Sequence, residues 1–222
     1  MTEARRFIIP FEKQQDRATE KRCAAAAMCM VYRALGLSVT QEDVWPRVSC
    51  RECQGSRLGR TYLLARDAQE RGLEAVVVAV AEPWTALRHL ARMPVLVVLN
   101  LRVHSRSSAG HYAVVRQVQE DGLFLHDPAL GPDQWLTREE FLHLWQAGGQ
   151  VMGPILVAVS RPAPDTAGCR FCFRQPPVRF LCPGCRQPIR LSPWAALGCW
   201  GARCPGRLWK TLYCPRCDCG TS

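Results

Sequence analysis

Cys23 has the residue type and the chain position of a nucleophile. It begins a run of good helix formers, residues 23–35, which is apolar on almost every side and is closed by Gly36. We therefore expect a buried helix with Cys23 in its first turn, where free N–H groups and the positive end of the helix dipole favour a thiolate. The charges of Lys21 and Arg22 act in the same direction. The alternative interpretation is a small apolar residue at the start of a core helix.

Two further side chains could complete a site for acyl transfer. A β-branched run starts at His111, a hairpin turn follows at residues 120–122, and the return strand ends at Asp127. In a tight antiparallel hairpin, residues 111 and 127 lie close together, which lets a carboxylate orient an imidazole. Cys23 would be the nucleophile, His111 the base that later protonates the leaving amine, and Asp127 the group that stabilises the imidazolium. Gln15 could donate a side-chain N–H to the oxyanion, together with the backbone N–H of Cys23.

The hydrophobic periodicity of the first 160 residues predicts an α+β fold. We expect helices over residues 40–46, 58–71, 84–92 and 137–145, and strands over residues 75–80, 95–101, 111–118, 123–127 and 154–160. Thr40 with Asp43, and Thr137 with Glu140, have the spacing of residues that cap a helix N-terminus. Because helices come first and an antiparallel sheet follows, the pattern is typical of an α+β domain.

The composition limits the class of protein. The chain has 222 residues, of which 48% are apolar, enough for one medium domain and one small one. It has no run of 18 apolar residues and no convincing signal peptide, so we expect a soluble, cytoplasmic protein without a membrane partner. Residues 161–222 hold 10 of the 29 Lys and Arg but 2 of the 19 Asp and Glu, so most of the net charge of +10 lies there. We expect one domain over residues 1–160, a linker over residues 161–165, and a second domain over residues 161–222.

Paired cysteines dominate the second domain. Eight of them form four closely spaced pairs: Cys169, Cys172, Cys182, Cys185, Cys199, Cys204, Cys214 and Cys217. In a cytoplasmic chain this spacing favours metal binding over disulfides, and four thiolates per ion predict two structural Zn²⁺ sites of the zinc-ribbon type. Zinc is then expected to fold this short segment. Sequential and cross-braced pairings both fit the spacing, and Cys219 could replace Cys217.

Cys50 and Cys53 form an isolated pair in an expected loop. Two thiolates do not complete a tetrahedral zinc site. The pair could be a redox pair or two ordinary loop cysteines, and a contribution to a shared metal site is the remaining alternative.

The second domain is expected to dock a partner and not to catalyse, because it has no histidine or spare carboxylate for an open metal site. Its arginines alternate with Trp194, Trp200, Trp209 and Tyr213, a composition compatible with binding nucleic acid. The alternative is that the aromatic residues form a small core and the arginines are solvated. Because metal-bound thiolates offset part of the positive charge, we favour a protein partner over nucleic acid.

The first domain resembles the bacteriocin-processing peptidases, papain-like cysteine peptidases that cut leader peptides after a double glycine. The resemblance covers roughly residues 7–160. It rests on a Gln before the Cys helix, on Gly-His-Tyr-Ala-Val-Val at 110–115, on His-Asp-Pro-Ala-Leu-Gly at 126–131, and on the capped helix at 137–145 with its Glu-Phe pair. The resemblance implies a papain-like fold, with N-terminal helices packed on an antiparallel sheet.

The resemblance also implies the roles of the candidate residues: Cys23 as nucleophile, His111 as base, Asp127 as orienting acid and Gln15 as oxyanion residue. Gln14 competes with Gln15 for the last role, and Ala24 stands where the family often has glycine. We therefore predict a cysteine peptidase that hydrolyses a peptide bond in a peptide or protein substrate through an acyl-enzyme. A non-catalytic adaptor that binds protein or nucleic acid is the alternative, and transfer of the acyl group to an amine is a variant of the same chemistry.

Overall fold

The computed structural model of the protein describes residues 7–16, 20–51, 55–104, 109–162, 169, 171–174, 179–190 and 198–221. The helices in these ranges are α1 (Cys23–Ala34), α2 (Gln41–Val48), α3 (Thr61–Glu70), α4 (Pro83–Leu90) and α5 (Arg138–Leu144). The first strands are β1 (Ser49–Arg51), β2 (Arg57–Gly59), β3 (Glu74–Val80), β4 (Leu96–Arg102), β5 (Gly110–Val118) and β6 (Gly122–Asp127). The later strands are β7 (Gly131–Thr137), β8 (Ile155–Ser160), β9 (Arg179–Leu181), β10 (Pro188–Arg190), β11 (Trp209–Tyr213) and β12 (Gly220–Thr221).

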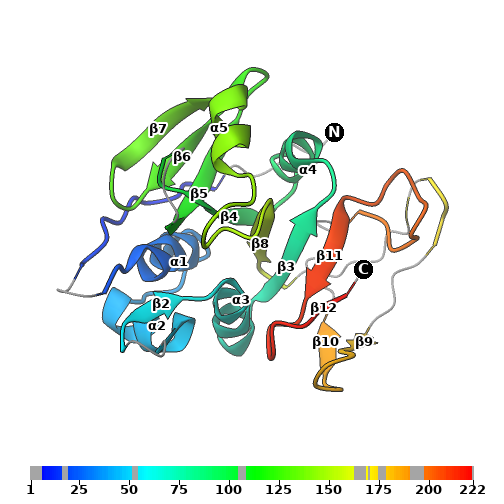
Figure 1. Ribbon diagram of the computed structural model, residues 1–222, viewed down its shortest axis with the longest axis horizontal. Coiled ribbons are helices and arrows are strands. Elements are labelled where there is room, and N and C mark those ends of the chain that lie inside the picture. The colour runs from blue at the N-terminus through cyan, green and yellow to red at the C-terminus, as the bar shows by residue number, and fades with distance from the viewer. Residues whose placement is uncertain are drawn as a thin grey trace.

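One antiparallel sheet of eight strands forms the centre of the molecule, in the order β12-β11-β3-β8-β4-β5-β6-β7. Figure 1 shows α1, α2 and α3 grouped together, with α5 beside the β5–β6–β7 end of the sheet. The β1–β2 and β9–β10 hairpins are separate two-stranded sheets. The α+β prediction is confirmed.

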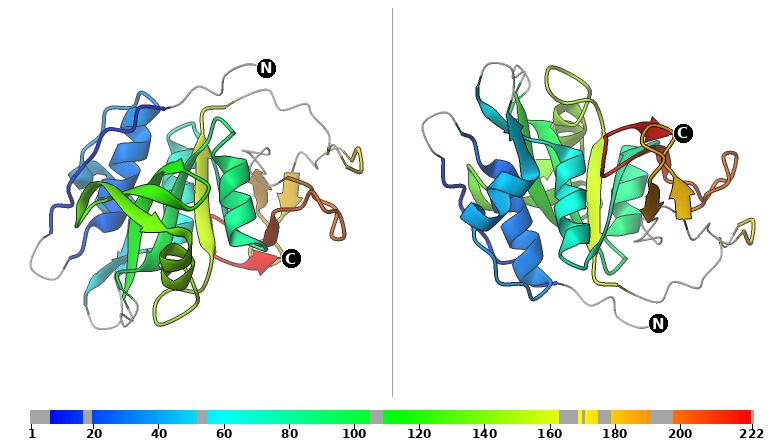
Figure 2. Two further views of the ribbon diagram at one scale, coloured as in Figure 1. Left: turned by 90° about the horizontal axis from the view of Figure 1, so that it is seen from above. Right: turned by 90° about the horizontal axis from the view of Figure 1, so that it is seen from below.

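The central strands β3, β4 and β8 are buried on both faces, which explains why they are continuous apolar runs. Along β3, Val77 points into a core shared with α1, α2 and α3, whereas Val76 and Val78 point into a second core shared with α4 and α5. Successive side chains of a strand point to opposite faces, so one apolar strand serves both cores. In Figure 2, α1 and α4 lie on opposite sides of the sheet.

Helix α1 is the most deeply buried helix of the first core, with its residues from Cys23 to Tyr32 all buried. Its far end is held by Asp67 of α3, which is itself buried. The Tyr32 hydroxyl donates to Asp67 at 2.7 Å, Arg71 at the C-cap of α3 donates at 2.9 Å, and Arg47 of α2 also pairs with this carboxylate. One buried carboxylate therefore links the three helices that cover this face.

The capping predictions are confirmed, whereas the predicted end of α2 is wrong. The side chains of Thr40 and Thr137 accept N–H bonds from Asp43 and Glu140, and both capping boxes are reciprocal. Proline lacks the N–H that a helix interior needs, so a stop near Pro46 was expected. The helix nevertheless continues to Val48, because burial of that last turn outweighs the lost bond.

Two predictions at the first core also differ from the structure. Cys50 lies in β1 and not in a loop, and residues 57–59, assigned in part to a helix, form β2. The helix itself begins at Thr61. Cys53 lies outside the described residues. Short hairpin strands such as these are fixed by pairing with each other and not by local periodicity.

Strand β11 connects the cysteine-rich segment to the rest of the protein. It pairs with the outer edge of β3, with Leu212 opposite Val78, and Figure 1 shows the two strands side by side. Trp209, Leu212 and Cys214 belong to the second core. Residues 161–222 therefore share a sheet and a core with residues 1–160. None of the described helices has the length and apolar character needed to span a bilayer.

We expect Asp67→Ala to destabilise the protein strongly, because it leaves Arg71 and Arg47 without their shared carboxylate next to the core. Loss of one partner from a buried ionic network costs about 3–5 kcal/mol. Urea unfolding followed by circular dichroism measures the change, and Glu139→Ala, at an exposed position of α5, is the control. A change of less than about 1 kcal/mol would mean that the network does not hold the three helices together.

Candidate active site

The β5–β6 hairpin brings His111 and Asp127 into contact, as the sequence predicted. The His111 Nε2 lies 2.8 Å from the Asp127 Oδ1, and both side chains are buried. The same oxygen accepts the backbone N–H groups of Ala129 at 2.8 Å and Leu130 at 3.0 Å. The turn after β6 therefore fixes the carboxylate, and the carboxylate in turn fixes the imidazole ring.

Cys23 also interacts with the imidazole of His111. Because Asp127 occupies Nε2, Nδ1 is the ring nitrogen that remains for the thiol. Burial by itself lowers the pKa of His111, but hydrogen bonds with Asp127 and with Cys23 outweigh it and raise this pKa to about 10. The contacts with Asp127 and Cys23 thus favour the protonated form of His111.

The shifted pKa values of His111 and Asp127 determine how this pair contributes to the stability of the fold at each pH. Since the pKa of His111 is raised from 6.5 to about 10, its contribution is fully present below about pH 6.5 and is lost as the pH rises through about 10. Burial tends to raise the pKa of Asp127, but its hydrogen bond from His111 keeps it below the ordinary 3.8. The Asp127 contribution is therefore present above pH 3.8 and is lost as the pH falls further.

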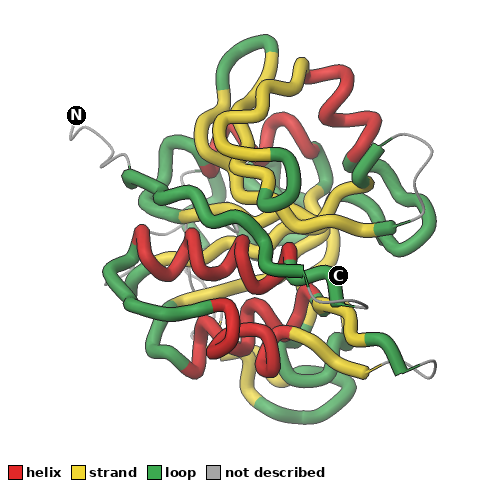
Figure 3. The backbone as a smooth tube through the Cα atoms, turned by 90° about the vertical axis from the view of Figure 1, so that its left-hand side faces the viewer, coloured by secondary structure: helices red, strands yellow, loops and turns green. Residues whose placement is uncertain are grey.

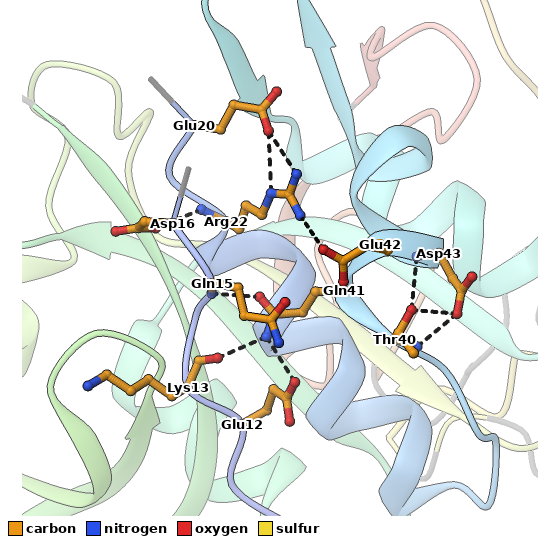
Figure 4. Close-up of polar contacts among 10 residues, drawn as sticks. All are labelled: Glu12, Lys13, Gln15, Asp16, Glu20, Arg22, Thr40, Gln41, Glu42 and Asp43. Atoms are coloured by element: carbon orange, nitrogen blue, oxygen red, sulfur yellow. Dashed lines mark hydrogen bonds and ion pairs between the residues drawn. The ribbon is translucent and has the colours of Figure 1, made fainter. Parts of the chain in front are cut away.

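The start of α1 differs in one respect from the prediction. The N-cap residue, Arg22, makes no side-chain hydrogen bond to the first N–H groups of this helix, and Cys23 in the same turn is 6% exposed. Arg22, however, does not support a thiolate. Its buried guanidinium pairs with Glu20 and Glu42, each at 3.0 Å, and lies over the ring of Trp45. Figure 4 shows this pairing, in which two carboxylates already compensate the positive charge.

An irregular N-terminal segment, residues 7–16, runs alongside α1 (Figure 3). The Gln14 N–H donates to the Pro128 carbonyl at 3.0 Å, next to the Asp127 turn. The Gln14 side chain is half-buried, and its Nε2 lies 2.9 Å from the carboxylate of Asp16, which also accepts the N–H of Arg22. The Gln15 side chain is exposed. Of the two glutamines, Gln14 therefore lies between the Asp127 turn and the start of α1.

A glycine accommodates Ala24, the residue that follows Cys23. A Cβ atom added to Gly59 of β2 would lie 2.5 Å from the Cβ of Ala24 and 3.3 Å from the ring of Tyr112. The Tyr112 hydroxyl is fixed by Thr61 at 2.9 Å. Strand β2 therefore packs against the first turn of α1 so closely that one of the two facing residues must lack a side chain.

The cysteine pairs of the tail come together in two groups of four. The first holds Cys169, Cys172, Cys199 and Cys204, and the second holds Cys182, Cys185, Cys214 and Cys217. The pairing is therefore the cross-braced alternative. Neighbouring sulfurs in the groups are 3.4–3.8 Å apart, close to the roughly 3.8 Å edge of a tetrahedron with metal–sulfur bonds of about 2.3 Å.

Each group can therefore hold a metal ion with four thiolates. Backbone N–H groups point at the sulfurs, as from Phe171 to Cys169 at 3.4 Å and from Gly201 to Cys199 at 3.2 Å. The N–H of Phe171 lowers the pKa of Cys169 to about 6, which favours the thiolate that binds metal. Cys219 lies outside both groups and directs its thiol at the Gly220 carbonyl.

A helix that carries a cysteine at its start, packed on an antiparallel sheet with a His–Asp pair at the end of one hairpin, is the arrangement of papain-like cysteine peptidases. The family follows from comparison with family models. The peptidase C39 family matches residues 10–152, and the chain belongs to this family. The predictions of a cysteine peptidase and of its relationship to double-glycine peptidases are confirmed.

Solved structures show the same fold at low sequence identity. A double glycine motif protease from an AMS/PCAT transporter, in complex with the leader peptide, is 21% identical, with a TM-score of 0.52, over 71% of this chain and 94% of that one. The peptidase domain of Streptococcus ComA, a bi-functional ABC transporter involved in a quorum sensing pathway, is 15% identical, with a TM-score of 0.51, over 68% and 97%. A C39-like peptidase from Bacillus anthracis is 14% identical, with a TM-score of 0.56, over 70% and 96%. No curated protein sequence matches this chain significantly.

We expect Gly59→Ala to displace the first turn of α1, because the new methyl group would overlap Ala24. The variant should melt at a lower temperature than the wild type and should label more slowly with iodoacetamide at Cys23. Ala24→Gly in the same chain should restore both properties by removing the opposing methyl group. Ala24→Gly alone, which costs about 1 kcal/mol of helix propensity, is the control. Failure of the second change to rescue the first would contradict the close packing.

We expect two metal ions per chain, with the pairing revealed by two double variants. Cys169→Ser with Cys199→Ser removes two ligands from one group and should leave the second ion bound as firmly as in the wild type. Cys169→Ser with Cys185→Ser removes one ligand from each group, so a mild chelator should remove both ions. Native mass spectrometry after chelation counts the ions. The reverse result would mean that the pairs combine sequentially along the chain.

Proposed function

We propose that the protein hydrolyses peptide bonds through a triad of Cys23, His111 and Asp127. The observation that carries this proposal is the buried 2.8 Å contact between His111 and Asp127, with Cys23 contributing to the raised pKa of the same imidazole. Burial disfavours a charged imidazole, yet the pKa of His111 is raised to about 10. A shift of this kind is typical of catalytic sites, and here a Cys23 thiolate would balance the imidazolium charge. The Arg22 side chain does not cap α1, and uncapped N–H groups at a helix N-terminus can bind an anion.

The reaction would follow from these positions. The Cys23 sulfur attacks the peptide carbonyl, a C–S bond forms, and an electron pair moves to the oxygen. When the pair returns, the C–N bond breaks and His111 gives its proton to the leaving amine. His111 then takes a proton from water, which attacks the thioester, and the C–S bond breaks to release the acid. Asp127 keeps the imidazole in one orientation throughout.

We assign the oxyanion donor to Gln14 in place of Gln15. The Gln14 backbone is bonded to Pro128, and its side chain is half-buried, whereas the Gln15 side chain is exposed. Asp16 accepts from the Gln14 Nε2 and from the N–H of Arg22, so it holds the donor nitrogen near the start of α1. A second donor is the backbone N–H of Cys23, as in other sites where a helix N-terminus faces the oxyanion.

The proposed substrate is a peptide with small residues at the cleavage site. One structural neighbour is a double glycine motif protease in complex with its leader peptide. In this chain Cys23 is nearly buried, and β2 packs at Gly59 against Ala24, the next residue, and against the ring of Tyr112. Such close surroundings favour an extended peptide with glycine or alanine before the cut bond.

We propose that the two cysteine groups bind structural Zn²⁺, the ion that most often takes four thiolates in a closed tetrahedron. When bound, the ion would hold two separate knuckles together and supply no reactive position. Cys182 and Cys214 are fully buried in the second core beside Trp209. Metal binding would therefore also support the strand that extends the sheet.

The first cysteine group is the proposed place for docking a protein partner. A hollow of about 580 Å³ beside it is lined by Phe171, Arg174 and Arg203, among others. Phe171 is 49% exposed, and the two arginines supply positive charge. In contrast, Trp200 packs on Trp209 at 5.0 Å, which removes these aromatic rings from a nucleic-acid surface. The contacts therefore favour an acidic protein segment over nucleic acid.

We expect Cys23 to react with iodoacetamide rapidly at pH 6–7, because His111 keeps its proton up to about pH 10 and can balance the thiolate. His111→Ala should slow labelling at this pH by at least about 10-fold, and Asp127→Asn should slow it less. Mass spectrometry of metal-loaded protein follows labelling at Cys23.

The control is Cys29, which is fully buried and whose pKa is raised by burial to about 12, so it should not label in any variant. Cys23 labelling that is no faster than for an ordinary exposed thiol, and that does not respond to His111→Ala, would contradict the peptidase proposal. That result would favour the non-catalytic adaptor.

A further inference from the structure

Gln41 is a buried amide in the first turn of α2 that reaches across to the N-terminal segment. It is 1% exposed. Its Oε1 accepts the N–H of Gln15 at 3.0 Å, and its Nε2 donates to the Lys13 carbonyl at 2.8 Å and to the Glu12 carboxylate at 2.9 Å. Figure 4 shows all three bonds leaving one side chain. Both N–H donors and the oxygen of Gln41 are thus used on a single stretch of irregular chain.

This stretch is the one that carries Gln14. The three contacts of Gln41 bracket it, with Glu12 and Lys13 before it and Gln15 after it. An irregular segment has no ladder of its own to fix its register, so contacts from outside must do so. Because Gln41 is in the first turn of a capped helix, its own position is well fixed.

The other side of the segment is attached to the hairpin that bears Asp127. The Gln14 N–H donates to Pro128, and the His126 ring donates from Nε2 to the Ile9 carbonyl at 3.1 Å. His126 can donate there because its Nδ1 accepts the N–H of Asp133 at 3.2 Å. Gln14 therefore lies between two anchors, one on the hairpin and one on α2.

We propose that Gln41 is a positioning residue for the oxyanion donor: it holds residues 12–15 so that the Gln14 amide stays beside the start of α1. This inference rests on the proposed function and adds a residue to it that does not touch the substrate. A donor displaced by about 1 Å loses much of its effect on the reaction, which can slow it up to about 100-fold. The Cys23 thiolate itself does not depend on Gln41.

Two small reagents distinguish stabilisation of the oxyanion from the reactivity of the Cys23 sulfur, and neither requires a known substrate. Iodoacetamide alkylates Cys23 by displacement at an sp³ carbon, so no oxyanion forms. With p-nitrophenyl acetate, the sulfur adds to the ester carbonyl, a C–S bond forms, the C–O bond breaks and nitrophenolate leaves. This second reaction passes through an oxyanion and should require Gln14. Both reactions are measured at Cys23 by mass spectrometry of the full, metal-loaded chain, with Cys23→Ser as the blank.

We expect Gln14→Ala to slow acetylation of Cys23 by about 100-fold or more and to leave alkylation within about 2-fold. Gln41→Met, which keeps the length of the side chain but removes its polar atoms, should slow acetylation by about 10–100-fold and also leave alkylation unchanged. In a chain that already has Gln14→Ala, Gln41→Met should add less than about 2-fold, because the residue acts through Gln14.

Gln69→Met is the matched control. Gln69 is a partly buried glutamine of α3 whose Nε2 donates to the Ala75 carbonyl at 2.8 Å, away from the N-terminal segment. It should leave both reactions unchanged. Melting temperatures of all variants identify a general loss of folding. Gln41→Glu is the second test, since it keeps the acceptor for Gln15 but opposes the Glu12 carboxylate, and it should also slow acetylation selectively.

The outcomes distinguish this inference from the proposed function. If Gln41→Met slows both reactions equally, or slows acetylation as much with Gln14→Ala as without it, the positioning role is overturned and the triad stands. If Gln14→Ala leaves acetylation unchanged, the donor assignment is overturned and the role of Gln41 with it. If wild-type Cys23 alkylates no faster than an ordinary thiol, the proposed function fails as well.

Discussion

A helix that is apolar on every side has to be covered on every side, and α1 imposes this requirement on the protein. One side packs on the sheet through β4 and β5, another on α2, and a third on the N-terminal segment. The buried carboxylate of Asp67 holds α3 against α1 and so helps to keep the helix covered. Cys23, at the N-terminal end of this helix, is itself only 6% exposed.

The candidate site is therefore formed by three segments that are distant in the sequence. The helix supplies Cys23 and the hairpin supplies His111 and Asp127, whose contact is fixed by the turn after β6. The N-terminal segment supplies Gln14, and it is attached to the hairpin at Pro128 and to α2 at Gln41. No single element contains enough of the site to act, so the chemistry depends on how accurately the fold brings them together.

The cysteine-rich segment is integrated into this fold through its last strands. An open edge at β3 would expose unpaired N–H and C=O groups, and β11 covers that edge. The chain enters the second cysteine group at Cys214 directly after β11, and Trp209 and Leu212 of that strand lie in the core beneath α4. This cysteine group and the outer part of the sheet are therefore physically connected, although residues 161–222 look like an independent module in the sequence.

Local patterns in the sequence predicted most of the elements and pointed to the candidate site residues. Capping residues fixed the starts of α2 and α5, apolar runs fixed the central strands, and the hairpin turn placed His111 near Asp127. Only the tertiary structure decided which glutamine faces inward, that the charge of Arg22 is already paired, that Gln41 anchors the N-terminal segment, and that the cysteine groups are cross-braced. The physical reason is the range of the interaction: periodicity and caps act over a few residues, whereas these contacts join side chains that no local pattern relates.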